Sequence, residues 1–154
     1  MAPAMAPIPV EKRLVATEFE ANDLKGKSVK LSQYKGKVVI LDFWATWCPP
    51  CKKGIPELMQ LHAEHQKSGL EVIGLSLDDK GAAVVQPFVD KNAVNYTMLL
   101  IAPRGTVAQT YVPSGRIPTM HILDRQGRIA QTIVGLVPKE TIAGIVRTLL
   151  EEKS

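Results

Sequence analysis

Two cysteines, Cys48 and Cys51, lie three positions apart and are the only cysteines of the chain. The residues before them, Lys37–Phe43, form an apolar and β-branched run that predicts a buried strand. The residues from Cys48 to about Ser68 predict a helix that Gly69 ends. The cysteines therefore lie where a strand ends and a helix begins. Cα atoms three positions apart in the first turn of a helix are roughly 5–6 Å apart, which suits a reversible disulfide.

Length and composition limit the possible classes of protein. A chain of 154 residues, 45% hydrophobic and 22% charged, is typical of one globular domain. The net charge of +4 comes from scattered lysines and arginines, so we expect no nucleic-acid binding. One cysteine pair excludes a disulfide-stapled mini-domain, and two thiols with three distant histidines do not predict a structural zinc site. No apolar run approaches the about 20 residues of a bilayer span.

The first residues of the chain differ in composition from the rest. Met1–Val10 contains three prolines, which favour extended and poorly packed backbone. We expect residues 1–16 to form a flexible Pro/Ala-rich tail and residues 17–154 to form one domain. The tail lacks the basic segment and the continuous apolar segment of a signal peptide. It is either a loose start or the remnant of a tether behind a removed export signal or anchor.

The remaining chain alternates predicted strands with predicted helices. Thr17–Ser32 predicts a hairpin with its turn at Lys25-Gly26-Lys27. Further strands are expected at 70–77, 96–101, 118–123 and 128–134, and further helices at 82–92, 106–111 and 139–150. This order predicts an α/β domain with a mixed β-sheet flanked by helices.

Several motifs together resemble those of the thioredoxin superfamily. They are the string FWATWCPPC at 43–51, Pro56 five positions after the second cysteine, and Ile117-Pro118-Thr119. The similarity covers residues 17–150. A predicted extra helix and strand within 81–102, the N-terminal hairpin and the string WCPPCKKxxPxL resemble the TlpA/ResA group of bacterial thiol–disulfide oxidoreductases. The resemblance implies a thioredoxin-like fold with these two additions, and an enzyme that exchanges its own dithiol for a substrate disulfide without a bound cofactor.

The CPPC motif suggests a role for each cysteine. Cys48 lies at the N-terminal edge of the predicted helix, where partial positive charge lowers a thiol pKa, so we predict that it is the nucleophile. Cys51, one turn further on, is predicted to resolve the mixed disulfide. Pro49 and Pro50 suit early helix positions, but Pro50 removes an N–H that could have stabilised the Cys48 thiolate. A less stabilised thiolate makes a weaker oxidant, which favours reduction of substrates.

Acidic residues at strand ends are the next candidates. Asp42 lies within an apolar strand, and burial without a partner raises the pKa of a carboxyl group. The resemblance implies that Asp42 accepts and donates the proton of Cys51. The alternative is an alternating strand whose Asp42 faces solvent. Asp78 and Asp79 follow the next strand, and we expect them to form an exposed turn pair rather than part of the site.

The expected substrate-binding residues surround the cysteines. Ile117-Pro118 resembles the cis-proline loop of the superfamily, in which the backbone before the proline pairs with the substrate chain. The alternative is an ordinary trans proline that begins a strand. We expect Trp47 to be an exposed aromatic rim and Trp44 to be packed. The predicted binding set is Trp47, Pro49, Pro50, Ile117 and Pro118.

Two other functions remain open from the sequence. A thioredoxin-fold copper module is one, because Met120 and His121 follow Pro118; a thiol peroxidase on the same fold is the other. His121 by itself predicts a hydrogen-bonded core or edge residue, and His62 and His65 predict helix-surface residues.

Partners and location follow from the resemblance. It implies protein substrates with disulfides or thiols, an upstream thiol protein as electron donor, and a monomer. Reduction of apocytochrome c cysteines and general extracytoplasmic disulfide reduction are both common in the family. The resemblance and the Pro/Ala-rich start imply a periplasmic or other extracytoplasmic location, tethered or free, with the cytoplasm as the alternative.

Overall fold

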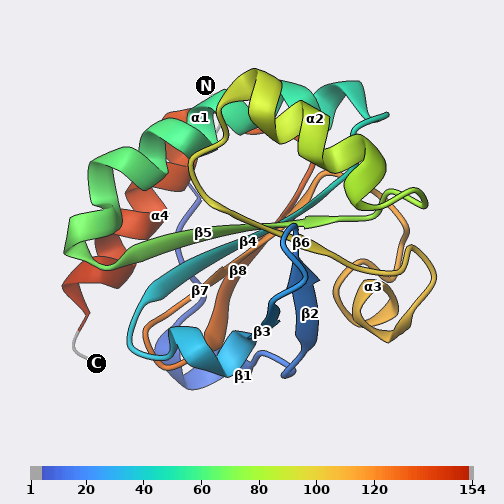
Figure 1. Ribbon diagram of the computed structural model, residues 1–154. Helices are drawn as coiled ribbons and strands as arrows, with labels where there is room; N and C mark the ends of the chain where they lie inside the picture. The colour runs from blue at the N-terminus through green and yellow to red at the C-terminus, as the bar shows by residue number, and fades with distance from the viewer. Residues whose placement is uncertain (1–4, 153–154) are drawn as a thin grey trace.

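The computed structural model describes residues 5–152, and it contains one eight-stranded β-sheet with helices on both faces (Figure 1). The central strand, β4 (Val38–Trp44), is buried along its whole length. It runs parallel to β5 (Leu70–Ser76) and antiparallel to β7 (Thr119–Leu123). A strand buried on both faces needs a mostly apolar sequence, which this segment has except at Asp42. The strand predicted at 37–43 is thus confirmed, with its bounds shifted by one residue.

The sheet is mixed, and its strands lie in the order β1-β8-β7-β4-β5-β6-β2-β3. The strands beyond the central three are β1 (Leu14–Val15), β2 (Glu20–Asp23), β3 (Ser28–Lys30), β6 (Thr97–Leu100) and β8 (Arg128–Val134). The hairpin β2–β3 confirms the hairpin predicted within residues 17–32, and β7 and β8, which form a second hairpin, confirm the strands predicted at 118–123 and 128–134. Strand β6 of the predicted insert runs parallel to β5 and pairs on its other side with β2, so the insert joins the N-terminal hairpin to the sheet.

Four α-helices and three short 3-10 helices complete the domain: α1 (Pro49–His65), α2 (Ala82–Asn92), α3 (Thr106–Tyr111), α4 (Lys139–Glu151), η1 (Val10–Lys12), η2 (Leu31–Tyr34) and η3 (Gln66–Ser68). Helices α1, α2 and α4 lie along one side of the sheet in Figure 1, and α3 lies apart from them. Alternate residues of β4 serve two cores: Ile40 and Trp44 pack with α1 and α4, whereas Leu41 and Phe43 pack with α3 and the N-terminal hairpin. Within residues 5–152, no helix is long and apolar enough to cross a membrane.

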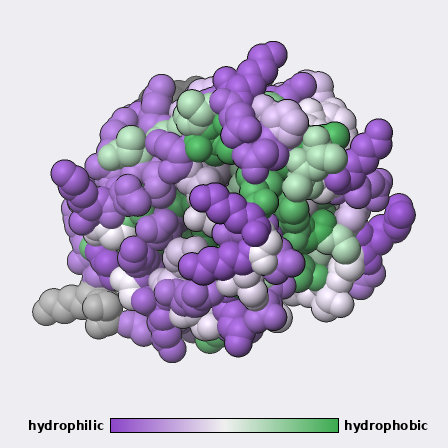
Figure 2. Space-filling model, viewed as in Figure 1, coloured by the Kyte–Doolittle hydropathy of each residue, from purple (hydrophilic) through white to green (hydrophobic). Residues whose placement is uncertain are grey.

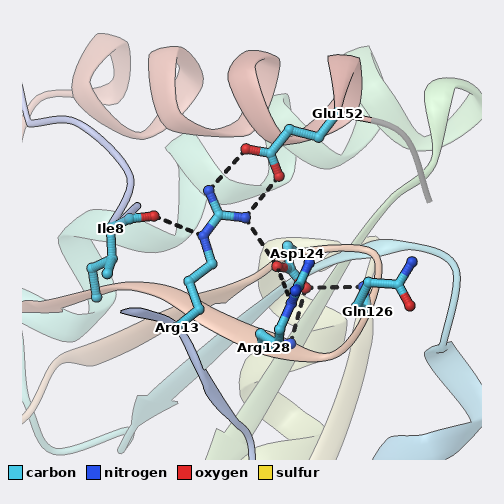
Figure 3. Close-up of polar contacts among 6 residues, drawn as sticks. All are labelled: Ile8, Arg13, Asp124, Gln126, Arg128 and Glu152. Atoms are coloured by element: carbon cyan, nitrogen blue, oxygen red, sulfur yellow. Dashed lines mark hydrogen bonds and ion pairs between the residues drawn. The ribbon is translucent and has the colours of Figure 1, made fainter. Parts of the chain in front are cut away.

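Residues 8–16 are attached to the domain, which differs from the expected flexible tail. The N–H of Ile8 donates to the Ala130 carbonyl at 2.7 Å, and β1 pairs with β8. The buried guanidinium of Arg13 donates to Asp124 at 2.9 Å and to both carboxylate oxygens of Glu152 at 2.7 and 2.8 Å (Figure 3). Proline content could not indicate these carboxylates, which lie more than 100 positions away. Residues 1–4 of the expected tail lie outside the described residues.

Two of the three histidines, His62 and His65, are more deeply placed than expected. His62 is buried, contrary to the prediction of a surface residue, and its Nδ1 accepts a hydrogen bond from the Val72 N–H at 3.4 Å. His65 is half-buried. His121 is buried and lies within hydrogen-bonding distance of Thr132 Oγ1 and the Tyr111 carbonyl, which confirms the prediction of a satisfied core histidine.

Candidate functional site

A disulfide joins Cys48 and Cys51 at the start of α1, with their Cα atoms 5.3 Å apart. Cys48 is the N-cap residue, and Pro49 and Pro50 are the first two residues of the helix. The prolines have no N–H group, so they leave no unpaired donor in this turn. The first available donor, the Cys51 N–H, lies 3.3 Å from Cys48 Sγ. The sequence-based placement of the pair at a strand–helix junction is therefore confirmed.

The two cysteines line different spaces in the structure. Cys48 lines an open cleft of about 570 Å³, together with the prolines of the motif and Ile117. Cys51 instead lines a small cavity of about 20 Å³ beneath the helix. Trp47 borders the cleft with 67% of its surface exposed, whereas Trp44 is fully buried, as expected for both. Both cysteines are buried, with 4% and 2% of their surfaces exposed, and Cys48 is the one of the pair that borders the open cleft.

The loop before β7 lies against Cys48. The Ile117–Pro118 peptide bond is cis, in agreement with the resemblance. The Ile117 carbonyl oxygen lies 3.8 Å from Cys48 Sγ, and the Pro118 carbonyl accepts from the Gly135 N–H at 2.8 Å. Within residues 5–152, the N–H and C=O of Ile117 make no backbone hydrogen bond. These two groups remain available to an extended chain that enters the cleft.

Asp42 lies in β4 beneath Cys51. It is buried, so the alternative of a solvent-facing side chain is wrong, and burial raises its pKa from 3.8 to about 7. Its neighbours across the sheet are Gly74 and Met120, and none of the ion pairs in the described chain includes Asp42. Asp42 and Cys51 line the same 20 Å³ cavity, which is large enough for one water molecule.

Asp78 belongs to the site, contrary to the prediction of an exposed turn residue. It is buried, and its carboxylate accepts hydrogen bonds from the Thr46 N–H at 3.0 Å, from Thr46 Oγ1 at 2.6 Å and from Ser76 Oγ at 2.7 Å. Asp78 thereby holds the loop between β4 and Cys48. Asp79 is exposed, as expected. Thr46 and Ser76 carry hydroxyl groups that can bind a carboxylate, which is the one hint of this role in the sequence. The pairing of β4 with β5 is what brings both residues to Asp78.

Three residues around the cleft were missed by sequence reasoning. Arg116 and Val134 line it with Trp47, and Leu136 lies close by over Gly54. Val134 and Leu136 are 53% and 51% exposed, which is unusual for such side chains. Val134 and Leu136 follow Pro118 by 16 or more residues, and it is the register of β8 on β7, with Val134 opposite Thr119, that places them beside the cleft.

The residues of the copper interpretation are not brought together. Met120 packs in the core beneath α1 and lines the cavity beside Cys51. His121 follows it in β7 and so faces the other side of the sheet, where it contacts Phe43 and Tyr111. In the described part of the chain, no three His, Cys, Asp or Glu side chains are grouped closely enough to hold a metal ion.

Comparisons with known proteins agree with this geometry. Residues 13–132 match the AhpC/TSA family. The thiol-disulfide oxidoreductase ResA of Bacillus thuringiensis (strain Al Hakam) is 31% identical over 134 residues, which cover 87% of this chain and 76% of ResA. A secreted thiol-disulfide isomerase from Corynebacterium glutamicum superposes with a TM-score of 0.87 at 28% identity, over 95% of this chain and 91% of the isomerase. A DsbF homologue from Corynebacterium diphtheriae gives a TM-score of 0.84 at 27% identity, over 93% and 91%.

The fold and the function predicted from the motifs are thereby confirmed at the level of the family. The Cys48–Cys51 disulfide at a helix N-terminus agrees with the thiol–disulfide chemistry in the names of these relatives. This chain belongs to the AhpC/TSA family of thioredoxin-fold proteins, and it is a ResA-like thiol–disulfide oxidoreductase.

Proposed function

We propose that this protein reduces disulfides of other proteins, with Cys48 as the attacking thiol, Cys51 as the resolving thiol and no bound cofactor. The observation that supports this assignment best is the different surroundings of the two sulfurs. Cys48 lines the open cleft, and Cys51 lines the much smaller cavity that it shares with Asp42. A substrate sulfur can therefore approach Cys48 while Cys51 stays protected until the second step.

The reaction proceeds by two exchanges in the reduced protein. The Cys48 thiolate attacks a substrate sulfur, so that a Cys48–substrate disulfide forms and the other substrate sulfur leaves as a thiolate. The Cys51 thiolate then attacks Cys48 Sγ, which forms the Cys48–Cys51 disulfide and releases the second substrate thiolate. The protein loses two electrons and the substrate gains them. An upstream thiol protein returns two electrons to the pair.

Asp42 is the proton acceptor for Cys51 in this proposal. Cys51 must lose its proton before it can attack, and the water-sized cavity connects its surroundings to the carboxyl group of Asp42. A pKa of about 7 allows Asp42 to accept a proton and release it again near neutral pH. An ordinary carboxyl group, with its pKa near about 4, would hold that proton too weakly.

The scarcity of backbone N–H donors around Cys48 Sγ favours reduction of substrates. Pro49 and Pro50 contribute no N–H, and the Lys52 N–H donates to the Cys48 carbonyl rather than to its sulfur. The Cys51 N–H is the donor that remains for Cys48 Sγ. Few donors stabilise a thiolate poorly, so the reduced form is readily oxidised and the protein is a better reductant than oxidant.

An extracytoplasmic location belongs to the proposal, with substrates either among apocytochrome c cysteines or among exported proteins in general. The support is the similarity to a thiol-disulfide isomerase that is itself described as secreted. Disulfides persist in the oxidising environment outside the cytoplasm. A reductant that works there therefore needs a dedicated electron donor.

The test is the reduction potential of the cysteine pair, measured by alkylation of free thiols after equilibration in graded dithiol/disulfide buffers. We expect a value near about −270 mV, and a value near about −120 mV would contradict the reducing direction. Cys51→Ser should accumulate a mixed disulfide through Cys48, whereas Cys48→Ser should not. Copper titration and peroxide consumption, run on the same reduced protein, separate the two alternative functions from disulfide reduction.

A further inference from the structure

The cleft beside Cys48 combines an apolar lining with one cation. Its lining side chains include Trp47, Ile117 and Val134. Among the residues of the described chain that line the cleft, Arg116 is the only charged one. Arg116 is exposed, and none of the ion pairs formed within residues 5–152 includes it. No carboxylate lines the cleft to balance this charge.

The backbone of Arg116 is fixed although its charge is unpaired. Its N–H donates to Ser114 Oγ at 3.2 Å, and its carbonyl accepts from Thr119 Oγ1 at 2.6 Å. The adjacent Ile117 keeps its own N–H and C=O free of backbone bonds. An arriving chain can therefore pair with Ile117 next to a residue whose backbone is held in the loop and whose charge is free to meet it.

We propose that Arg116 selects substrates by charge: the preferred partner is an extended protein segment with an acidic side chain within two positions of its reacting cysteine and an apolar side chain facing Trp47 and Val134. This inference rests on the proposed reduction of protein disulfides and names the substrate class. Residues two apart in an extended chain lie about 7 Å apart on the same face, so a side chain near the cysteine remains beside the cleft. An exposed arginine–carboxylate pair adds a modest attraction, and like charges repel by a similar amount.

The experiment uses the full chain, reduced beforehand and freed of the reductant, in single-turnover reactions with two disulfide-linked peptide dimers. The peptides share one apolar residue next to the cysteine and differ only in glutamate or lysine two positions from it. The rate is the appearance of peptide thiol, and the rate of each dimer with dithiothreitol corrects for its intrinsic reactivity. We expect the glutamate dimer to react about fivefold faster at low salt and the two rates to converge at about 1 M salt.

Four variants separate charge selection from other roles of Arg116. Arg116→Glu is expected to invert the preference, Arg116→Gln to abolish it and Arg116→Lys to keep most of it. Arg104→Gln removes an equal charge from an exposed position outside the cleft and should leave the preference unchanged. Recognition of this kind changes the ratio of the two rates, whereas an effect of Arg116 on Cys48 itself changes both rates by one factor.

Two results would overturn the proposal while leaving the reductase function in place. One is an equal corrected rate for both dimers with the unchanged protein. The other is an Arg116→Gln variant that slows both dimers by the same factor, which would assign Arg116 to thiolate stabilisation. Failure of the reduced protein to react with either dimer would overturn the proposed function together with the charge preference.

Discussion

Replacement of Asp42 by asparagine is expected to stabilise the oxidised protein at alkaline pH. The substitution keeps the size of the side chain and removes its charge. Because burial raises the pKa of Asp42 from 3.8 to about 7, the folded chain binds this proton more tightly than the unfolded chain does. The stability from this group is complete below about pH 4 and is lost as the pH rises through about 7.

The size of the effect follows from the two pKa values. A tenfold change in proton affinity corresponds to about 1.4 kcal/mol, so the difference between 3.8 and about 7 corresponds to about 4 kcal/mol. The wild-type protein should lose this amount of unfolding free energy, relative to Asp42→Asn, between about pH 4 and about pH 8. Imperfect hydrogen bonding of the asparagine amide adds a constant offset but no pH dependence.

Urea unfolding of the oxidised protein at a series of pH values measures this difference. All other titrating groups are common to both proteins, so the difference in unfolding free energy between them isolates Asp42. Asp79→Asn, which removes the same charge from an exposed position, is the matched control. A difference between Asp42→Asn and wild type that stays constant from pH 4 to about pH 8 would refute the assignment of a raised pKa to Asp42.

Three further substitutions test other parts of the structure. Gly74→Ala places a Cβ 2.6 Å from Met98 Sδ and should cost about 1 kcal/mol in urea unfolding, since the flexible methionine can shift; a cost that persists in a Met98→Ala background would exclude this clash. Arg13→Met should cost about 3 kcal/mol at neutral pH because it leaves the Asp124 carboxylate buried without this partner, and a loss under 1 kcal/mol would show that the remaining bonds of Asp124 suffice. Burial lowers the pKa of His62 below 6.5, so its contribution to stability is complete above 6.5 and is lost as the pH falls from there through the lowered pKa. His62→Gln should flatten this loss of stability toward acid pH in thermal melts, and an unchanged loss would assign it to other groups.

Much of the redox centre could be predicted from the sequence because its chemistry is local. The spacing of Cys48 and Cys51 within one helical turn sets their distance, and the prolines between them remove donors wherever the helix packs. The apolar run of β4 likewise predicts its own burial. Ile117-Pro118 was identified only through the family resemblance, since nothing in its local sequence indicates that it lies against Cys48.

The surroundings of that centre could not be predicted, because they depend on which strands pair. Asp78 reaches Thr46 only after β4 pairs with β5, and Val134 reaches the cleft only through the β7–β8 hairpin. Arg13 is the extreme case: it follows a proline-rich segment that predicts a loose tail, yet its guanidinium is buried between carboxylates from distant parts of the chain. The proline content of a segment indicates how its backbone behaves locally, but it does not indicate which distant residue will pair with a charged side chain in it.

The sequence by itself determined that this protein carries a dithiol that can close at the start of a helix, because helical geometry and proline chemistry act within a few residues. Tertiary structure alone decided how deeply Asp42 is buried beside Cys51 and that Arg116 lines the cleft next to Cys48. The physical reason is that desolvation and electrostatic complementarity are set by neighbours in space, and here those neighbours come from β4, β7 and β8 together with the start of α1.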